Sequence, residues 1–308
     1  MANTEFDVII IGGGPAGMSA GLVLGRSRIK TLILNTEAPR NNVTTHSHAF
    51  LTQDGKHPSE IFATALEQLK KYPAANYKRE KALNLLPIEN GYSVETESET
   101  YQAQRVIIAT GYTDQIDTLG IPNLTEVYGK SVYPCPFCDG FELADKKLAI
   151  FGDAIEAPMF SKIISHWSKD IIVFTNGEPI THLGLEYSLE KNNIKIIDQK
   201  IKRLNSNNGI LESITLENGV IIERDAGFIA DIKATESTDF AKSLNLTKAF
   251  DKNDKEIYIV NESFETELKG LFIIGDARSG WSRIAGAVSE GSKVAVAITH
   301  QIINENWN

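Results

Sequence analysis

The N-terminal segment of this 308-residue chain contains a short apolar stretch that runs directly into a glycine-rich turn. The stretch Phe6 to Ile11 reads as a strand, and it is followed by Gly12-Gly-Gly-Pro-Ala-Gly17, which fits the spacing G-x-G-x-x-G. A helical stretch from Pro15 to Ser27 and a second apolar strand that begins near Lys30 complete a strand–helix–strand unit. This order constrains the fold strongly, because it is typical of dinucleotide-binding domains with a parallel sheet.

The three glycines of this loop have separate tasks. Gly12 permits the tight turn, Gly14 lets a pyrophosphate approach the backbone, and Gly17 lets the helix pack closely on the strand. The phosphates are expected beside Pro15 and Ala16 at the N-terminus of the helix, where backbone N–H groups and the helix dipole favour negative charge. The loop therefore predicts a dinucleotide site.

The acidic residue that usually binds a ribose hydroxyl about 20 residues after such a loop is missing here. Asn35 stands at the end of the second strand instead, and Glu37 follows shortly after it. Because an asparagine can still hydrogen-bond a ribose hydroxyl, Asn35 is a candidate cofactor ligand. The alternative is that Asn35 is a plain turn residue.

A second strand–helix–strand pattern begins at Lys147, but its loop differs from a working nucleotide loop. The loop reads Gly152-Asp-Ala-Ile-Glu-Ala157, so that Ala154 replaces the glycine that would let a pyrophosphate approach. Asp153 and Glu156 add carboxylates at the helix N-terminus, where they would repel the phosphates and occupy the dipole themselves. We therefore expect a nucleotide-type fold with a weakened phosphate site.

This second pattern also lacks a residue that would bind the 2′-phosphate of NADPH. No arginine occurs between Arg105 and Arg203, although arginine is the residue that usually binds the 2′-phosphate of NADPH.

Further strands are expected near Arg105, Gly227 and Gly270. Because strands alternate with helical patterns, the chain predicts parallel sheets in an α/β fold.

The composition excludes several classes of protein. A net charge of -9 and a pI of about 5.3 argue against a nucleic-acid partner, which would require a basic face. No apolar run approaches the roughly 18 residues of a membrane helix, and the N-terminus lacks the basic region of a signal peptide. Two cysteines cannot make the disulfide framework of a secreted protein, so we expect a cytoplasmic protein without a membrane partner.

Both cysteines, Cys135 and Cys138, lie at the spacing C-x-x-C within the stretch YPCPFCDGFE. A zinc site would need four ligands, but no further cysteine follows and the histidines are scattered, so no metal is expected. An inert packed pair is an alternative. A redox-active pair is favoured, because this spacing can lower the pKa of one thiol and the thiolate is the reactive form.

The order of these motifs resembles the low-molecular-weight thioredoxin reductases over nearly the whole chain. The most specific parts are Cys135-Pro-Phe-Cys138-Asp139-Gly140, the pair Gly275-Asp276, and Arg283-Ile284-Ala285. The resemblance implies an α/β fold with two Rossmann-like, three-layer nucleotide-binding domains, one inserted in the other. It also implies a homodimer.

The resemblance further implies domain boundaries and residue roles. A discontinuous FAD-binding domain is expected at 1–112 and 237–308, and a pyridine-nucleotide-type domain that carries the C-x-x-C at 113–236. Cys138 is implied to exchange electrons with the flavin, Cys135 to attack a substrate disulfide, and Asp139 to relay a proton. The candidate FAD ligands are Gly12, Gly14, Pro15, Ala16, Gly17, Asn35, Arg40, Asn41, Thr110, Gly111, Asp276, Arg283, Ile284 and Ala285.

A few residues resemble one subgroup, the thioredoxin-reductase-like flavoproteins that include dithiol oxidases. They are the stretch Pro39-Arg40-Asn41, the nearby His46 and His48, and the Pro-Phe pair between the cysteines. A histidine near the flavin or the dithiol could act as a base, because its pKa ordinarily lies near neutrality. A structural role for both histidines is the alternative.

Together these features predict an FAD-dependent dithiol/disulfide oxidoreductase without family-type NADPH binding. Its substrate would be a thioredoxin-like protein or a small dithiol or disulfide, and its electron donor would be NADH, ferredoxin or another flavoprotein. The alternatives are a conventional NAD(P)H-dependent thioredoxin reductase, a dithiol oxidase that uses oxygen, and a flavin-bearing redox sensor whose disulfide state is recognised by a partner protein.

Overall fold

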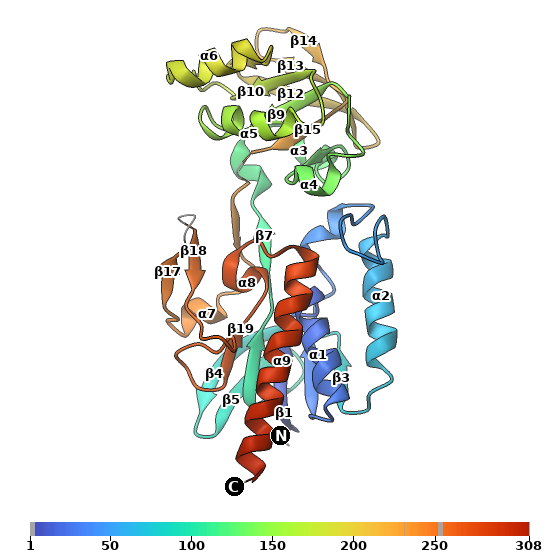
Figure 1. Ribbon diagram of the computed structural model, residues 1–308, viewed down its shortest axis with the longest axis vertical. Helices are drawn as coiled ribbons and strands as arrows, with labels where there is room; N and C mark the ends of the chain where they lie inside the picture. The colour runs from blue at the N-terminus through green and yellow to red at the C-terminus, as the bar shows by residue number, and fades with distance from the viewer. Residues whose placement is uncertain (1–3, 231, 252–254, 308) are drawn as a thin grey trace. The chain divides into compact units, whose positions relative to one another are not determined.

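The computed structural model describes residues 4–230, 232–251 and 255–307 of the chain, and Figure 1 shows its course. No helix within these ranges combines the length and the apolar character that crossing a membrane requires.

The chain forms two compact units. The first consists of Met1–Arg40, Ser59–Thr113 and Thr235–Asn308, and the second consists of Asn41–Pro58 and Asp114–Ala234. The segment Asn41–Pro58 thus packs with the second unit, although it lies within the N-terminal range 1–112 in the sequence.

The first unit is built on a seven-stranded sheet. Its strands are β1 (Thr4–Ile11), β2 (Thr31–Leu34), β3 (Ala75–Lys78), β4 (Ala82–Ile88), β5 (Gly91–Thr96), β6 (Thr100–Ile108) and β19 (Leu271–Ile273). The order is β3-β2-β1-β6-β5-β4, and β19 also pairs with β6. β3, β2, β1, β6 and β19 run parallel, and β5 and β4 continue the sheet in antiparallel fashion.

Both faces of this sheet are covered. Val8 and Ile10 of β1 pack with the helices α1 (Pro15–Arg26), α2 (Pro58–Leu69) and α9 (Arg283–Trp307). Ile9 and Ile11 point to the opposite core, as expected for a strand buried on both faces. Figure 1 shows α1 and α9 side by side. A side chain on Gly291 would come within 2.1 Å of the carbonyl oxygen of Ala16, so glycine permits this close helix contact.

Short elements complete the first unit and its connections. They are α7 (Phe240–Ser243), α8 (Asp276–Ser279) and the antiparallel pair β17 (Lys248–Phe250) and β18 (Glu256–Tyr258). The chain passes between the units through β7 (Tyr112–Asp114) and β16 (Ala234–Glu236), which pair with each other.

The second unit is built on a five-stranded parallel sheet in the order β11-β10-β9-β15-β8. These strands are β8 (Val132–Tyr133), β9 (Leu148–Phe151), β10 (Ile171–Phe174), β11 (Lys195–Ile197) and β15 (Ala226–Ile229). An antiparallel sheet is formed by β12 (Ile201–Asn207), β13 (Ile210–Leu216) and β14 (Ile221–Glu223). The helices are α3 (Leu124–Val127), α4 (Pro136–Asp139), α5 (Glu156–Ile164) and α6 (Leu183–Lys191), with a 3-10 turn η2 (Ile116–Leu119). A further 3-10 turn, η1 (Arg40–Val43), begins at Arg40 of the first unit and continues into Asn41–Pro58 of the second.

Three layers make up this second unit. Leu148 and Ile150 of β9 belong to a core shared with α5 and α6, whereas Ala149 and Phe151 belong to a core shared with α3 and the antiparallel sheet. Two units with largely parallel, doubly covered sheets confirm the predicted α/β fold.

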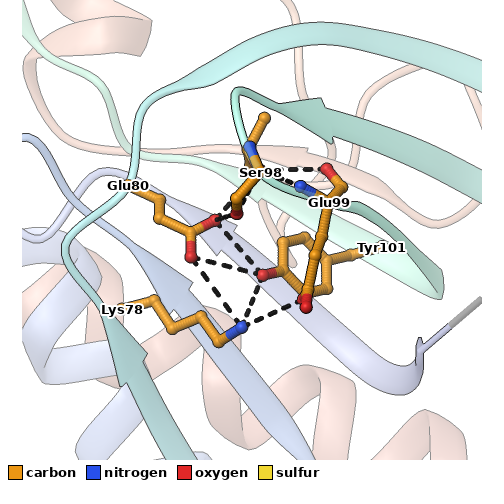
Figure 2. Close-up of polar contacts among 6 residues, drawn as sticks. Lys78, Glu80, Ser98, Glu99 and Tyr101 are labelled. Atoms are coloured by element: carbon orange, nitrogen blue, oxygen red, sulfur yellow. Dashed lines mark hydrogen bonds and ion pairs between the residues drawn. The ribbon is translucent and has the colours of Figure 1, made fainter.

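A polar cluster lies around the hydroxyl group of Tyr101 in the first unit, and Figure 2 shows its members. The Nζ atom of Lys78 lies 2.6 Å from this hydroxyl and 3.1 Å from an oxygen of Glu99. The hydroxyl also donates toward the carboxylate of Glu80, at 3.2 Å for the nearer oxygen. The Oγ atom of Ser98 donates to the same carboxylate at 3.0 Å. Because Tyr101 is fully buried, this cluster satisfies a polar atom that would otherwise be costly to bury.

Candidate functional site

The glycine-rich loop of the first unit has the shape of a phosphate cradle. α1 begins at Pro15, no side chain caps its N-terminus, and no acidic residue lies in its first turn. Gly12 has a φ angle of 110°, and a side chain there would lie 2.3 Å from the carbonyl oxygen of Ala109. A side chain on Gly17 would clash with Gly12, whereas the space beside Gly14 is open. The loop therefore offers backbone N–H groups and room, which fits the pyrophosphate of a dinucleotide.

The end of β2 shows which side chains stand where an acidic ribose ligand would be expected. The Oδ1 atom of Asn35 accepts a hydrogen bond from the N–H of Gly13 at 3.1 Å, and its Nδ2 donates to the hydroxyl of Tyr77 at 3.0 Å. That hydroxyl in turn donates to Glu37 at 2.9 Å, and Arg79 forms an ion pair with Glu37 at 3.2 Å. Asn35 thus fixes the loop, while Glu37 brings a carboxylate to the same strand end.

Tyr77 was not identified from the sequence, because it lies on a different strand from Asn35. Burial raises the pKa of Tyr77 to about 12, and the neighbouring Glu37 adds to this shift. The tyrosine therefore stays protonated at neutral pH and can donate its hydrogen bond.

The expected Thr110-Gly111 segment follows β6 at the same end of the sheet as the loop. The hydroxyl of Thr238 donates to the hydroxyl of Thr110 at 3.1 Å, and the carbonyl oxygen of Gly111 accepts from the N–H of Ser237 at 3.1 Å. Gly111 has a φ angle of 69° and no atom within 4 Å of the position of a side chain. This open backbone is compatible with a cofactor that lies against it.

Asp276 lies at the centre of a second group of expected ligands. Its Oδ1 accepts hydrogen bonds from the N–H of Ser282 at 2.7 Å and from the Ser282 hydroxyl at 2.8 Å. Its Oδ2 pairs with Arg40 at 3.2 Å, and Arg40 also donates to the carbonyl oxygen of Gly280 and lies over the ring of Trp281. The fold thus joins two candidate residues that are far apart in the sequence.

The remaining candidate ligands divide between the units. Arg283, Ile284 and Ala285 form the first turn of α9 directly after this Asp276 group, and Arg283 and Ala285 are exposed. Asn41 instead belongs to the second unit, where its carbonyl oxygen accepts from the N–H and the hydroxyl of Thr44.

The two cysteines begin and end the first turn of α4 in the second unit. Cys135 is the N-cap residue with an extended backbone, and Pro136 at the first helical position provides the φ angle that a helix start requires. The N–H groups of Cys138 and Asp139 both donate to the carbonyl oxygen of Cys135 at 3.2 Å. Cys135 is 5% exposed and Cys138 is half-buried, so a substrate can reach Cys135 only if its sulfur becomes more accessible.

Glycine and aromatic residues fix the surroundings of this turn. A side chain on Gly140 would lie 2.8 Å from the ring of Trp167, which explains why glycine follows Asp139. Phe137 packs edge-on against Trp167, with ring centroids 5.6 Å apart. Phe137 and Phe141 are both exposed, so they border the dithiol turn with apolar surface.

Asp139 has an unusual acidity for an aspartate. Burial raises the pKa of its carboxyl group from 3.8 to about 7, and the nearby charges of Cys135 and Glu142 raise it further in the same direction. Burial and the charges of Asp139 and Glu142 raise the pKa of Tyr133 to about 12, and its hydroxyl donates to the carbonyl oxygen of Lys130 at 2.5 Å. A carboxyl group that titrates near pH 7 beside a dithiol can both donate and accept a proton under neutral conditions.

The segment Asn41–Pro58 brings one of the two singled-out histidines to the dithiol segment. The Nε2 atom of His48 lies 3.6 Å from Glu142, and its Nδ1 atom lies 3.7 Å from Asp54. His46 instead contacts the hydroxyl of Thr45 at 3.0 Å. Nothing in the local sequence around either residue indicates that Glu142 meets His48.

The loop after β9 is filled by carboxylates of the chain itself. The Oδ1 atom of Asp153 accepts hydrogen bonds from the N–H groups of Ile155 at 2.8 Å and Glu156 at 2.7 Å. The N–H of Ala154 donates to Glu178 at 3.3 Å. Three backbone donors of a nucleotide-type loop are therefore already used, and no local sequence pattern indicates that Glu178 is one of the acceptors.

At the end of β10, where a residue that binds a 2′-phosphate would be expected, the side chain forms hydrogen bonds within the protein. The side chain of Asn176 donates to the carbonyl oxygen of Leu119 at 3.2 Å and accepts from the N–H of Ile201 at 3.0 Å. Its amide group is therefore committed to neighbouring backbone.

Comparison with known proteins gives a consistent result. The chain matches the model of the family "Pyridine nucleotide-disulphide oxidoreductase" over residues 6–291. It is 30% identical to a protein of Arthroderma benhamiae named "Probable thioredoxin reductase", over 98% of this chain and 81% of that protein. It is 25% identical to the thioredoxin reductase of Bacillus subtilis, over 96% of this chain and 95% of that protein. The crystal structure of TrxB from Bacillus anthracis, described as a candidate thioredoxin reductase, matches with a TM-score of 0.90 at 32% identity, over 98% of this chain and 99% of that one.

Proposed function

Because the chain belongs to the pyridine nucleotide-disulphide oxidoreductase family, we propose that it moves electron pairs between FAD and a dithiol or disulfide substrate by way of Cys135 and Cys138. It is an FAD-binding, thioredoxin-reductase-like oxidoreductase that acts on a sulfur group. FAD supplies the two-electron chemistry when it is bound. The chain's own residues bind it, hold the thiols and move protons.

We assign FAD binding to the discontinuous part of the chain, residues 1–112 and 237–308, and a pyridine-nucleotide-type fold to residues 113–236. The assignment is supported by the open, uncapped N-terminus of α1 and by the contrast with the filled loop after β9. The pyrophosphate would lie on the Gly12–Gly17 loop. Glu37, held by Tyr77, is placed to bind a ribose hydroxyl together with or instead of Asn35.

The dithiol reaction is an exchange of one S–S bond for another. Reduction of a substrate disulfide breaks its S–S bond, forms the Cys135–Cys138 bond and leaves two substrate thiols, and the reverse exchange oxidises a substrate dithiol. We place Cys135 on the substrate side and Cys138 on the flavin side. Asp139 gives a proton to the leaving thiolate and becomes a carboxylate, which then takes a proton back from the next thiol.

The observation that carries this proposal is that the single turn of α4 and its N-cap bring Cys135, Cys138 and Asp139 together, where burial raises the pKa of Asp139 to about 7. A carboxyl group that is still protonated near neutral pH can supply the proton that a leaving thiolate takes up. Perturbed acids of this kind are typical of active sites.

The test is anaerobic reduction of the FAD-loaded protein by a small dithiol, followed at the flavin absorbance band. Cys138→Ser should abolish the reduction, and Cys135→Ser should abolish exchange with a substrate disulfide. Both variants should keep their FAD content. If both variants turn over at the wild-type rate, the cysteine pair is not catalytic and the proposal fails.

We further propose that NADPH does not bind the second unit in the manner usual for the family. Supporting observations are the carboxylates of Asp153 and Glu178 on the loop N–H groups, and the absence of arginine between Arg105 and Arg203. A dianionic pyrophosphate would have to displace both carboxylates and would meet their charge. The electron donor would then be another reductant, such as a reduced electron-transfer protein or the dithiol itself.

Removal of the charges of Asp153 and Glu178 tests whether these carboxylates prevent nucleotide binding at the loop after β9. Asp153→Asn combined with Glu178→Gln should tighten binding of NADH or NADPH by at least about tenfold, which corresponds to roughly 1.4 kcal/mol. Glu186→Gln, an exposed acid on α6, is the matched control and should have no effect. Fast flavin reduction of the wild type by micromolar NADPH would instead make the protein a conventional NADPH-dependent thioredoxin reductase.

The partners that we propose are a thioredoxin-like protein or a small dithiol, and a second copy of this chain. The name shared by the relatives supports the first, and an apolar stripe on α9 supports the second. Val296, Ile303 and Trp307 lie on one helix face by their spacing and are 46%, 52% and 87% exposed. The presence of only two cysteines, at a reactive spacing, supports a cytoplasmic location.

A further inference from the structure

The contact between His48 and Glu142 links a segment distant in sequence to the dithiol turn. Glu142 lies just beyond the end of α4, close to Asp139 in the sequence, and its charge is one of the causes of the raised pKa of Asp139. His48 faces Glu142 with Nε2 at 3.6 Å and Asp54 with Nδ1 at 3.7 Å, and only 19% of its side chain is exposed. A half-buried imidazole between two carboxylates is an arrangement that requires explanation.

Asp54 is itself fixed, because its Oδ1 accepts a hydrogen bond from the N–H of Ala49 at 2.8 Å. It places a carboxylate on the Nδ1 side of the His48 ring, whereas Glu142 lies on the Nε2 side. At these distances the contacts are ion pairs rather than hydrogen bonds, and they attract His48 only when its ring is doubly protonated. In that form His48 brings a positive charge next to Glu142.

We propose that His48 is a positioning residue that holds Glu142 beside the dithiol turn and offsets its negative charge while Asp139 donates or takes up a proton. This inference rests on the proposed function, because it concerns the proton transfer that accompanies thiol–disulfide exchange. His48 does not act as the base: its two ring nitrogens face Asp54 and Glu142, and the proton moves between the leaving sulfur and Asp139.

The groups whose charges matter here come from two segments. Around Asp139 they include Cys135, Tyr133 and Glu142. Around His48 they include Asp54, Glu142 and His46, whose ring centroid lies 6.1 Å from that of His48. Glu142 is common to both sets, so the effect of His48 on Asp139 should depend on the charge of Glu142.

The test is the pH profile of the exchange between the reduced, FAD-loaded protein and a small disulfide. The rate should fall above the pKa of Asp139, because the proton donor is then lost. His48→Gln leaves Glu142 uncompensated and should move this falling limb up by about half a pH unit, the size expected for a partly exposed ion pair. Glu142→Gln should move it down by a similar amount.

The decisive comparison is His48→Gln in the Glu142→Gln background, where it should produce no further shift. His182→Gln is the matched control, because His182 is an exposed histidine of the same unit at the start of α6, and it should leave the profile unchanged. If His48→Gln does not fold, Asp54→Asn, which keeps the acceptor for Ala49, should produce a smaller upward shift.

Three results would overturn the inference. They are a falling limb that does not move in His48→Gln, a shift of equal size with and without Glu142→Gln, or an equal shift in His182→Gln. These outcomes are separate from failure of the proposed function, which would appear as exchange that no longer requires Cys135. If the exchange requires the cysteines but the falling limb of the pH profile does not move in His48→Gln, only the role proposed for His48 is wrong.

Discussion

Replacement of Asp139 by asparagine should stabilise the protein, and the gain should grow with pH. The folded protein holds a proton on Asp139 up to a pKa of about 7, whereas the unfolded chain releases it near the ordinary value of 3.8. Because the native state binds more protons in this window, the free energy of unfolding falls as pH rises from about 4 to about 7. In the Asp139→Asn variant this position no longer lowers the free energy of unfolding as pH rises, because the asparagine side chain does not ionise in this range.

The magnitude follows from the size of the shift. Each pKa unit corresponds to about 1.4 kcal/mol, so the full shift of roughly three units gives an upper limit of about 4 kcal/mol above pH 7. Asp139 retains some contact with solvent, which weakens the effect, so we expect about half of this. The asparagine variant should therefore be more stable by about 2 kcal/mol at about pH 8, and by only about 0.5 kcal/mol at about pH 4.5.

The assay is thermal unfolding of the reduced, FAD-loaded protein at these two pH values. Asp145→Asn is the matched control, because Asp145 is an exposed aspartate in the same unit, and it should show no pH-dependent gain. An advantage of Asp139→Asn that is equal at both pH values would refute the reasoning. In that case Asp139 would not hold a proton near neutral pH and could not serve as the proton donor.

Three further predictions concern the first unit. Gly12→Ala should lose most of its FAD, because the new side chain would lie 2.3 Å from the Ala109 carbonyl oxygen, and a wild-type ratio of flavin to protein absorbance would contradict this. Tyr101→Phe should lower the free energy of unfolding by about 1–3 kcal/mol in urea, because Lys78 loses a buried partner; an unchanged midpoint would show that the cluster is dispensable. Trp307→Glu should weaken self-association in light scattering at low concentration, and an unchanged mass would exclude the α9 stripe as the dimer contact.

The sequence alone determined the parts of this protein that depend on neighbouring residues. The loop Gly12–Gly17 could be identified because a strand, a tight turn and a helix start impose their residue types locally, and the structure has each where expected. The start of the Cys135–Cys138 turn is equally local, since Pro136 fixes the backbone at the first helical position. The family model and the solved relatives confirm the fold class that follows from these motifs.

Only the tertiary structure decided which side chains from distant segments meet. Glu178 reaches the N–H of Ala154 because β9 and β10 are paired side by side, so that the loops after them meet at one sheet edge. His48 reaches Glu142 because the segment Asn41–Pro58 packs with the second unit. Such contacts depend on how strands and loops are arranged in space, and no local pattern of residue types encodes that arrangement.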